Sequence, residues 1–132
     1  MAVPKVEVSR SCDKSPVWQF PNGDVVIETN QIGTKYDNNM DCRWSISSNA
    51  RIELSFLVFE MESGHDVVQV YDGESSSAPL IGRFSGASIP SPETSSSSKL
   101  FLQFTTDVSS TFFGFRARVR GMMLFCCMFH KS

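Results

Sequence analysis

Three acidic residues, Glu62, Asp66 and Asp107, could act together at one site, although they lie far apart in the sequence. Each stands where an alternating or apolar segment gives way to turn residues. If the flanking strands end at the same edge of a sheet, we expect the three acids to converge. Three carboxylates brought together repel unless a cation neutralises them, and calcium is a hard cation that takes oxygen ligands from loops. The alternative is that Asp66 and Asp107 cap turns while Glu62 is solvated.

The segments around these acids have the patterns of β-strands. Apolar and polar side chains alternate over 52–58 and 115–119, which indicates strands with one buried face. The more continuous apolar runs at 67–71 and 100–105 are typical of central strands. Turn dipeptides such as Asn22-Gly23 separate the segments, and no helical period lasts beyond a turn, which favours an antiparallel sandwich or barrel. Further short strands are expected at 24–28, 42–47 and 80–84, and a mobile Ser- and Pro-rich loop at 85–98.

Length and composition limit the possible functions. The 132 residues fit one domain, and eleven Phe and two Trp can build its core. A net charge of -2 without a basic run disfavours nucleic-acid binding. Residues 1–10 lack the apolar region of a signal peptide, and the apolar stretch 122–129 is too short to cross a bilayer, so we expect a fragment of a secreted protein and no transmembrane segment.

The four cysteines form two pairs that need different explanations. Cys12 and Cys42 lack CxxC spacing and nearby histidines, which favours a disulfide over zinc, although two buried free thiols remain the alternative. A disulfide implies an oxidising compartment. Trp44 is expected to pack this bridge against the core. Cys126 and Cys127, in the apolar tail, could be acylated or pair between chains, or belong to a frayed end.

A series of sequence patterns resembles the CUB domain, the extracellular β-sandwich module of complement proteases, tolloid-like proteases, cubilin and spermadhesins. Any one pattern is weak, but all of them occur in order over residues 12–120. They are Cys12; Tyr36-Asp-Asn-Asn-Met-Asp-Cys42-Arg-Trp44-Ser-Ile46; Ile52-Glu-Leu-Ser-Phe56-Leu-Val-Phe59-Glu-Met-Glu62; Asp66-Val-Val-Gln-Val-Tyr-Asp72-Gly73; and Asp107-Val-Ser109 followed by Gly114-Phe115.

This resemblance implies an all-β, jelly-roll-like antiparallel sandwich over 12–120, with an N-terminal extension at 1–11 and an apolar tail at 121–132 outside the fold. It implies that Glu62, Asp66 and Asp107 are ligands of weakly held calcium, with Tyr36 and Ser109 beside them. In the family, a ligand carboxylate keeps one oxygen free for a Lys or Arg of the partner. The expected function is non-enzymatic binding of another extracellular or receptor protein, outside the cell or in an ectodomain.

The chain departs from the family in one respect. Most members carry a second disulfide, with cysteines shortly before Asp66 and next to Gly86, whereas this chain has Ser63-Gly64-His65 and Phe84-Ser85 there. Without that bridge we expect a softer loop near the acidic site. One-disulfide members, including the CUB and sushi multidomain proteins, have a similarly short loop.

Six further side chains are candidate partner contacts. The arginines share the outer face of one strand and could meet sulfated glycan or an acidic partner, although a solvated face is the plainer interpretation. Two adjacent phenylalanines cannot both enter the core, so one is expected beside the acids. The histidine is either a pH-sensitive neighbour or a simple loop residue. These side chains are His65, Phe112, Phe113, Arg116, Arg118 and Arg120.

Two other functions remain open. The arginine face could make the chain a calcium-independent glycan or heparin binder of spermadhesin type. The chain could also be an accessory domain of a secreted protease. No nucleophile motif includes either histidine, and no Gly-rich phosphate loop is present, so we do not expect an enzyme.

Overall fold

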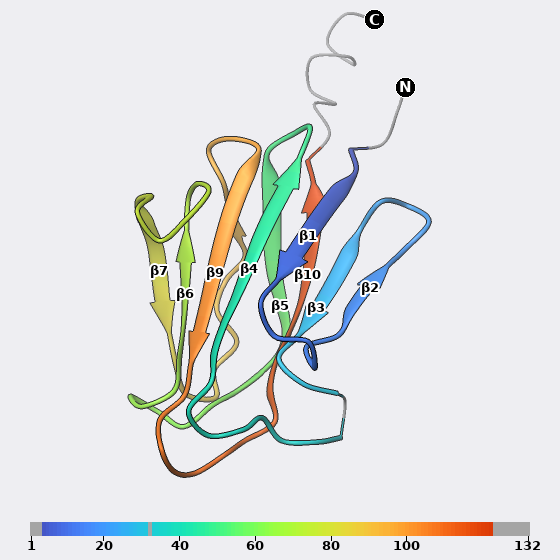
Figure 1. Cartoon of the computed structure of the whole chain (residues 1–132). Helices are drawn as coiled ribbons and strands as arrows, with labels where there is room; N and C mark the ends of the chain where they lie inside the picture. Colours follow the sequence, from blue (N-terminus) through green and yellow to red (C-terminus); the bar gives the residue numbers. More distant parts are fainter. Residues whose placement is uncertain (1–3, 32, 123–132) are drawn as a thin grey trace, which may run out of the picture.

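A computed structural model describes residues 4–31 and 33–122 of the chain, which form two antiparallel sheets of five strands each, facing one another (Figure 1). The strand orders are β1-β4-β9-β6-β7 and β2-β3-β10-β5-β8. The expected all-β antiparallel sandwich is confirmed. Among the described residues, no helix has the length and apolarity that a membrane crossing needs. The strands are β1 (Val6–Arg10), β2 (Val17–Gln19), β3 (Val25–Glu28), β4 (Asp41–Ser48), β5 (Ile52–Glu60), β6 (Val67–Tyr71), β7 (Leu80–Phe84), β8 (Glu93–Thr94), β9 (Lys99–Thr105) and β10 (Gly114–Gly121).

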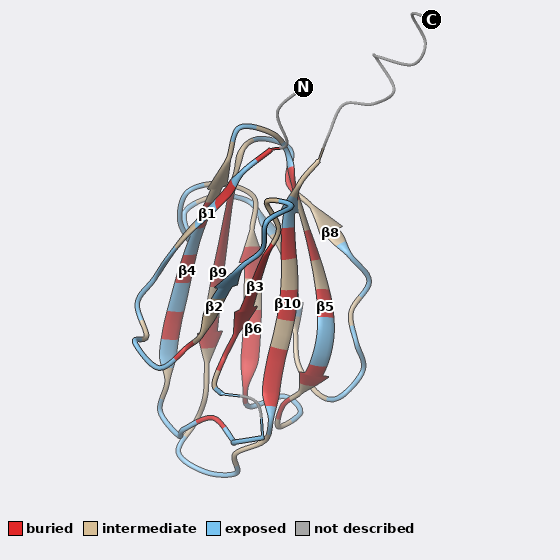
Figure 2. Cartoon of the chain, turned by 90° about the vertical axis from the view of Figure 1, so that its right-hand side faces the viewer, coloured by how far each residue is buried: buried red, intermediate tan, exposed pale blue. Residues whose placement is uncertain are grey.

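The core lies between the sheets and is built from the inward sides of alternating strands. Buried residues alternate with less buried ones along β4 and β10 (Figure 2). In β5, Leu54 and Phe56 are buried, but an extra residue, Leu57, then shifts the pairing with β10. Because of this bulge, Phe59 returns to the core while Leu57 and Val58 stay exposed.

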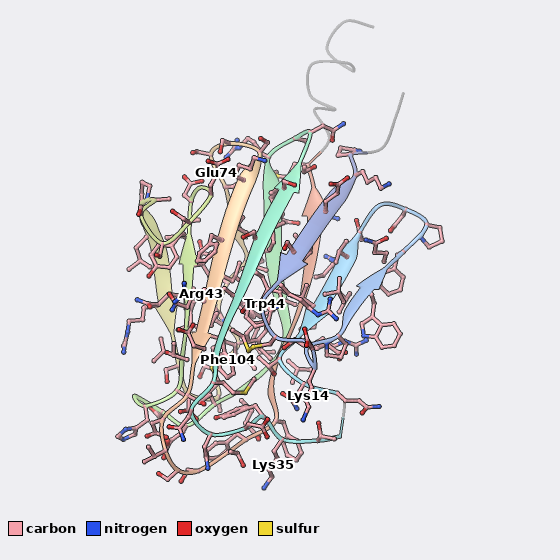
Figure 3. All side chains as sticks on the ribbon, viewed as in Figure 1. Lys14, Lys35, Arg43, Trp44, Glu74 and Phe104 are labelled. Atoms are coloured by element: carbon pink, nitrogen blue, oxygen red, sulfur yellow. A yellow bond between two sulfur atoms is a disulfide. The ribbon has the colours of Figure 1, made fainter. Side chains whose placement is uncertain are left out.

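The disulfide between Cys12 and Cys42 is confirmed, with Cα atoms 5.4 Å apart. It ties the segment before β2 to the first half of β4, and Cys42 is buried in the core. Trp44, on the same strand, is also buried, and its ring centroid lies 5.4 Å from that of Phe115 in the other sheet. Figure 3 shows Trp44 and Phe104 on neighbouring strands close to the yellow disulfide.

Three strands are absent from the sequence prediction. β1 pairs with β4 over Val6–Arg10 and buries Val6, so sheet pairing begins within the expected extension at 1–11. The very short β2 and β8 lie at opposite edges of the second sheet, and β8 lies within the expected loop at 85–98. These strands offer too few alternating residues for a period to be recognised. Residues 123–132, with Cys126 and Cys127, are outside the described part.

One end of the sandwich collects three loops that are distant in sequence. β5 ends at Glu60 and β9 ends at Thr105, whereas β4 begins at Asp41 and β6 begins at Val67. Antiparallel pairing therefore places residues 29–31 with 33–40, 61–66 and 106–113 together at the bottom of Figure 1. All three predicted acids lie in these loops.

Candidate metal-binding site

Asp66 is the buried centre of the site. Its side chain is fully inaccessible to solvent, and both of its oxygens accept hydrogen bonds. Oδ2 accepts the hydroxyl of Tyr36, and Oδ1 accepts the N–H of Asp107 at 2.9 Å. The Tyr36 hydroxyl accepts the N–H of Glu62 at 3.2 Å. Asp66 therefore connects all three loops. The structure brings the three acids together at one end of the sandwich, as the sequence led us to expect.

Tyr36 is buried and acts as a donor to Asp66. Its ring packs edge-on against Phe104, with centroids 5.2 Å apart. Burial, and secondly the hydrogen bond to the Asp66 carboxylate, raise the pKa of Tyr36 well above its usual range. The phenol therefore keeps its proton at physiological pH and remains a donor.

Glu62, His65 and Asp107 form a second cluster next to Asp66. One ligand atom from each of the three lies within 4.8 Å of the others. His65 Nδ1 is 3.4 Å from Asp107 Oδ2, and the N–H of Ser109 donates to Asp107 Oδ1 at 3.1 Å. Among the described residues, buried Oε1 of Glu62 has no hydrogen-bond partner. Loss of solvent, and then the Asp107 carboxylate, raise the pKa of Glu62.

The loop before β6 is short because a tight turn closes it. The N–H groups of His65 and Asp66 both donate to the carbonyl of Glu62, at 3.3 and 3.0 Å, and Gly64 takes a positive φ of 79°. A positive φ is costly for most residues but not for glycine. This turn brings the backbones of Glu62 and Asp66 together just before β6.

Ser85 joins the two segments where most family members have their second disulfide. Its hydroxyl accepts the N–H of Gly64 at 2.9 Å and lies 2.6 Å from the carbonyl of Asp66 and 3.1 Å from that of Glu62. One hydroxyl proton can serve only one carbonyl at a time. The Glu62 to Asp66 loop is therefore anchored to the end of β7 without a covalent bond, a contact that the sequence patterns did not reveal.

The donor set fits a hard cation. The carboxylates of Glu62 and Asp107 lie close together, and Oε1 of Glu62 is buried without a partner. The third carboxylate, of Asp66, accepts the N–H of Asp107. Each Asp66 oxygen uses one lone pair for a hydrogen bond and retains another. Calcium favours such carboxylates completed by carbonyls and water. His65 adds a nitrogen ligand that zinc also accepts.

Of the adjacent phenylalanines, one is partly buried against the core and the other is exposed. Phe112 packs on the core cluster, and its carbonyl accepts the N–H of Tyr36 at 3.0 Å. Phe113 is 50% exposed, and the ammonium of Lys35 lies 5.8 Å from its ring centroid. One exposed aromatic near the acidic loops was expected, whereas Lys35 was missed because its position depends on the loop conformation.

The three arginines of β10 are on the outer face, as expected, but two have acidic neighbours. Arg116 Nε lies 3.5 Å from a carboxylate oxygen of Glu28, and Arg120 Nε lies 2.7 Å from that of Glu53. Glu28 is almost fully buried and accepts the indole N–H of Trp18 at 2.7 Å. Arg118 is half-buried between them. The pairing leaves this face less positive than the sequence suggests.

The protein is therefore a β-sandwich module of two antiparallel sheets. The loops at one end of it carry an acidic site around the buried Asp66. The family model of the CUB domain matches residues 12–119. The chain belongs to the CUB domain family, which confirms the resemblance of its sequence patterns.

Relatives and solved structures agree with this assignment. Tolloid-like protein 2 of Homo sapiens is 42% identical over 89 residues, which cover 63% of this chain and 9% of that protein. Cubilin of Sus scrofa is 40% identical over 98 residues, which cover 69% of this chain and 3% of cubilin. The chain thus spans less than a tenth of either relative.

Two solved structures share the fold. The CUB1-EGF-CUB2 domain of human MASP-1/3 superposes with a TM-score of 0.67 at 22% identity, covering 80% of this chain and 43% of that one. The MASP-1 CUB2 domain bound to Ca2+ superposes with a TM-score of 0.65 at 20% identity, covering 74% and 92% respectively.

Proposed function

We propose that this chain is a non-enzymatic, extracellular CUB module that binds a partner protein through loops ordered by calcium. Glu62, Asp66 and Asp107 are the proposed protein ligands, and Ser109 helps to orient Asp107. The observation that carries the proposal is Glu62 Oε1, which is buried without a hydrogen-bond partner next to a second carboxylate. A buried anionic oxygen without a partner is costly unless a cation neutralises it.

Two further findings support calcium in particular. The site lies on loops and offers mostly carboxylate oxygens, which suit a hard cation that tolerates irregular geometry. In addition, the MASP-1 CUB2 domain of similar fold has been solved with Ca2+ bound. The cation would supply positive charge between the loops, while the residues of this chain orient the carboxylates and exclude water behind Asp66.

The partner proposed is a protein with an exposed Lys or Arg. Asp107 is about a third exposed, so one of its oxygens can face outward while the other faces the cation. Phe113, which is exposed on the same loop as Asp107, would add apolar contact. Such a pair, charged and partly desolvated, gives specificity and a fast association rate more than raw affinity.

Calcium titration tests the proposal. With a dissociation constant of roughly 0.1 to 1 mM, about 10 mM calcium should stabilise the fold by about 1.4 to 2.7 kcal/mol, a rise in Tm of roughly 6 to 11 °C over chelator. Asp107→Asn should abolish this rise because it removes one charge but keeps the side-chain shape. Glu7→Gln, at an exposed position on β1, is the matched control and should respond fully.

Calorimetry with calcium, magnesium and zinc completes the test. Binding heat for calcium alone supports the proposal. No heat and no Tm shift at millimolar calcium would refute it, and a preference for zinc would reassign the site to His65 with the two carboxylates.

The glycan-binding alternative is less well supported because Glu28 and Glu53 pair with two of the three arginines. That alternative requires glycan binding that survives chelator and weakens steeply with salt. The accessory-domain alternative would require further domains, and it stays open because the chain spans less than a tenth of the relatives that it matches.

A further inference from the structure

The segment 87–92 lies along the open edge of β5 without joining the sheet. At one end, the carbonyl of Gly86 accepts the N–H of Met61 at 2.8 Å, and at the other, Glu93 pairs with Leu54. Between these anchors, no residue of the segment takes part in a hydrogen bond of the described chain. Figure 2 shows the chain leading to β8 running beside β5. The segment is therefore a strap held only at its two ends.

Two prolines keep this strap extended. Pro90 and Pro92 have a fixed φ and no N–H, and each also restricts the residue before it, Ile89 and Ser91, to extended conformations. The result is a short stretch close to polyproline II, which has its backbone in water and loses little entropy when an enzyme binds it. Ile89 is 57% exposed.

The serines of this region differ in what their hydroxyls already do. Ser85 is hydrogen-bonded to the loop before β6, and buried Ser95 accepts the N–H of Ile52 at 2.8 Å and donates to the carbonyl of Ser97 at 2.5 Å. Ser88 and Ser91 are exposed, and within the described chain their hydroxyls have no partner. These two hydroxyls are the ones that an external enzyme could reach on an extended backbone.

We propose that Ser88 and Ser91 are sites of mucin-type O-glycosylation, with Ser91 between its two prolines as the main site. Exposed Ser- and Pro-rich segments are typical acceptors for this modification. The Cys12–Cys42 disulfide places the folded chain in an oxidising compartment, where sugar transferases act and most proline-directed kinases do not.

The chemistry is a glycosyl transfer from a nucleoside diphosphate sugar. The Ser91 oxygen forms a bond to the anomeric carbon of N-acetylgalactosamine, and the bond from that carbon to the diphosphate oxygen breaks. The nucleoside diphosphate leaves, and the serine proton is released to it or to water. No oxidant or reductant is needed.

The sugar would also have a structural effect at this edge. From Ser55 to Glu60, β5 pairs with β10 on one side, whereas β8 covers the other side only at Glu53 and Leu54. Open strand edges with exposed apolar side chains favour pairing with other chains. A hydrophilic sugar at Ser91 would cover the strap and exposed Ile89, and so would protect the edge.

Site-resolved mass spectrometry tests the proposal on the full chain secreted from animal cells behind an added leader. We expect N-acetylhexosamine on Ser91 and to a lesser extent on Ser88, and none on Ser85 or Ser95. Ser91→Ala should remove most of the modification, whereas the matched change Ser96→Ala, at an exposed serine without flanking prolines, should leave it unchanged.

Three outcomes would overturn the proposal: an unmodified strap, sugar confined to residues 75–77 or 96–97, or phosphate in place of sugar. If a variant is not secreted, the refolded chain is incubated with a peptide N-acetylgalactosaminyltransferase and labelled sugar nucleotide. Label at Ser91 in the folded chain is then required. Neither readout depends on calcium, so the result is independent of the proposed cation site.

Discussion

Tyr36→Phe should destabilise the protein although it removes only one oxygen atom. That hydroxyl donates to the fully buried Asp66 carboxylate and accepts the N–H of Glu62. Hydrogen bonds to a charged group are worth about 1.5 to 3 kcal/mol, and a backbone N–H that loses its partner adds about 0.5 to 1.5 kcal/mol. We therefore expect a loss of about 2 to 4.5 kcal/mol, which corresponds to a fall in Tm of roughly 8 to 18 °C for a domain of this size.

Chemical and thermal unfolding in chelator measure this loss. Tyr71→Phe is the matched control, because Tyr71 is half-buried on β6 and its hydroxyl is in none of the hydrogen bonds of the described chain. It should change the free energy of unfolding by less than about 0.5 kcal/mol. A similar, small effect for both variants would refute the view that Tyr36 holds the buried carboxylate in place.

A double-mutant cycle with Asp66→Asn separates the interaction from general damage to the core. If the Tyr36 hydroxyl acts through Asp66, the two changes should be non-additive, with a coupling energy of about 1 to 3 kcal/mol. Additive losses would mean that the Tyr36 hydroxyl acts through its other contact, the N–H of Glu62, and not through Asp66.

Three further changes test other parts of the structure. Reducing the Cys12–Cys42 bridge, whose cysteines are 30 residues apart, should cost about 3.7 kcal/mol on the chain-entropy model and lower Tm measurably in a scan with and without reductant. Gly114→Ala should cost at least about 2 kcal/mol in denaturant titration, because this residue has a φ of 85° and an added Cβ would clash with the Thr29 hydroxyl. Ser85→Ala should cost about 1 to 2 kcal/mol and accelerate hydrogen exchange in the loop before β6, whereas unchanged exchange would contradict its anchoring role.

The convergence of the three acidic residues could be predicted because the ends of the strands determine where these residues lie. Once β5, β6 and β9 are recognised by their periods, antiparallel pairing leaves Glu62, Asp66 and Asp107 at one end of the sandwich. The distance in sequence between them is then irrelevant. The CUB patterns added the register, and with it the position of Tyr36.

The different environments of these acids could not be predicted in the same way. Asp66 is fully buried and hydrogen-bonded on both oxygens, whereas Asp107 stays partly open. This difference depends on loop dihedrals, including positive φ values at Asn39 and Ser110, that no hydrophobic period encodes. The same holds for Lys35 over Phe113, a contact between two loops. Short edge strands such as β1 escaped prediction because pairing, more than propensity, maintains them.

Ser85 holds its loop by hydrogen bonds where the family resemblance leads us to expect a disulfide, and this changes what calcium would do in this chain. A covalent bridge stabilises mainly by restricting the unfolded chain, whereas hydrogen bonds of Ser85 act only once the loop is folded and contribute about 1 kcal/mol each. The loop that holds Glu62 therefore has less to offset the repulsion between Glu62 and Asp107, which, after loss of solvent, raises the pKa of Glu62. A cation between these carboxylates would remove that repulsion directly. On this reasoning, bound calcium contributes more to loop order here than in a CUB domain with two disulfides, and hydrogen exchange of residues 61–66 with and without calcium measures that contribution.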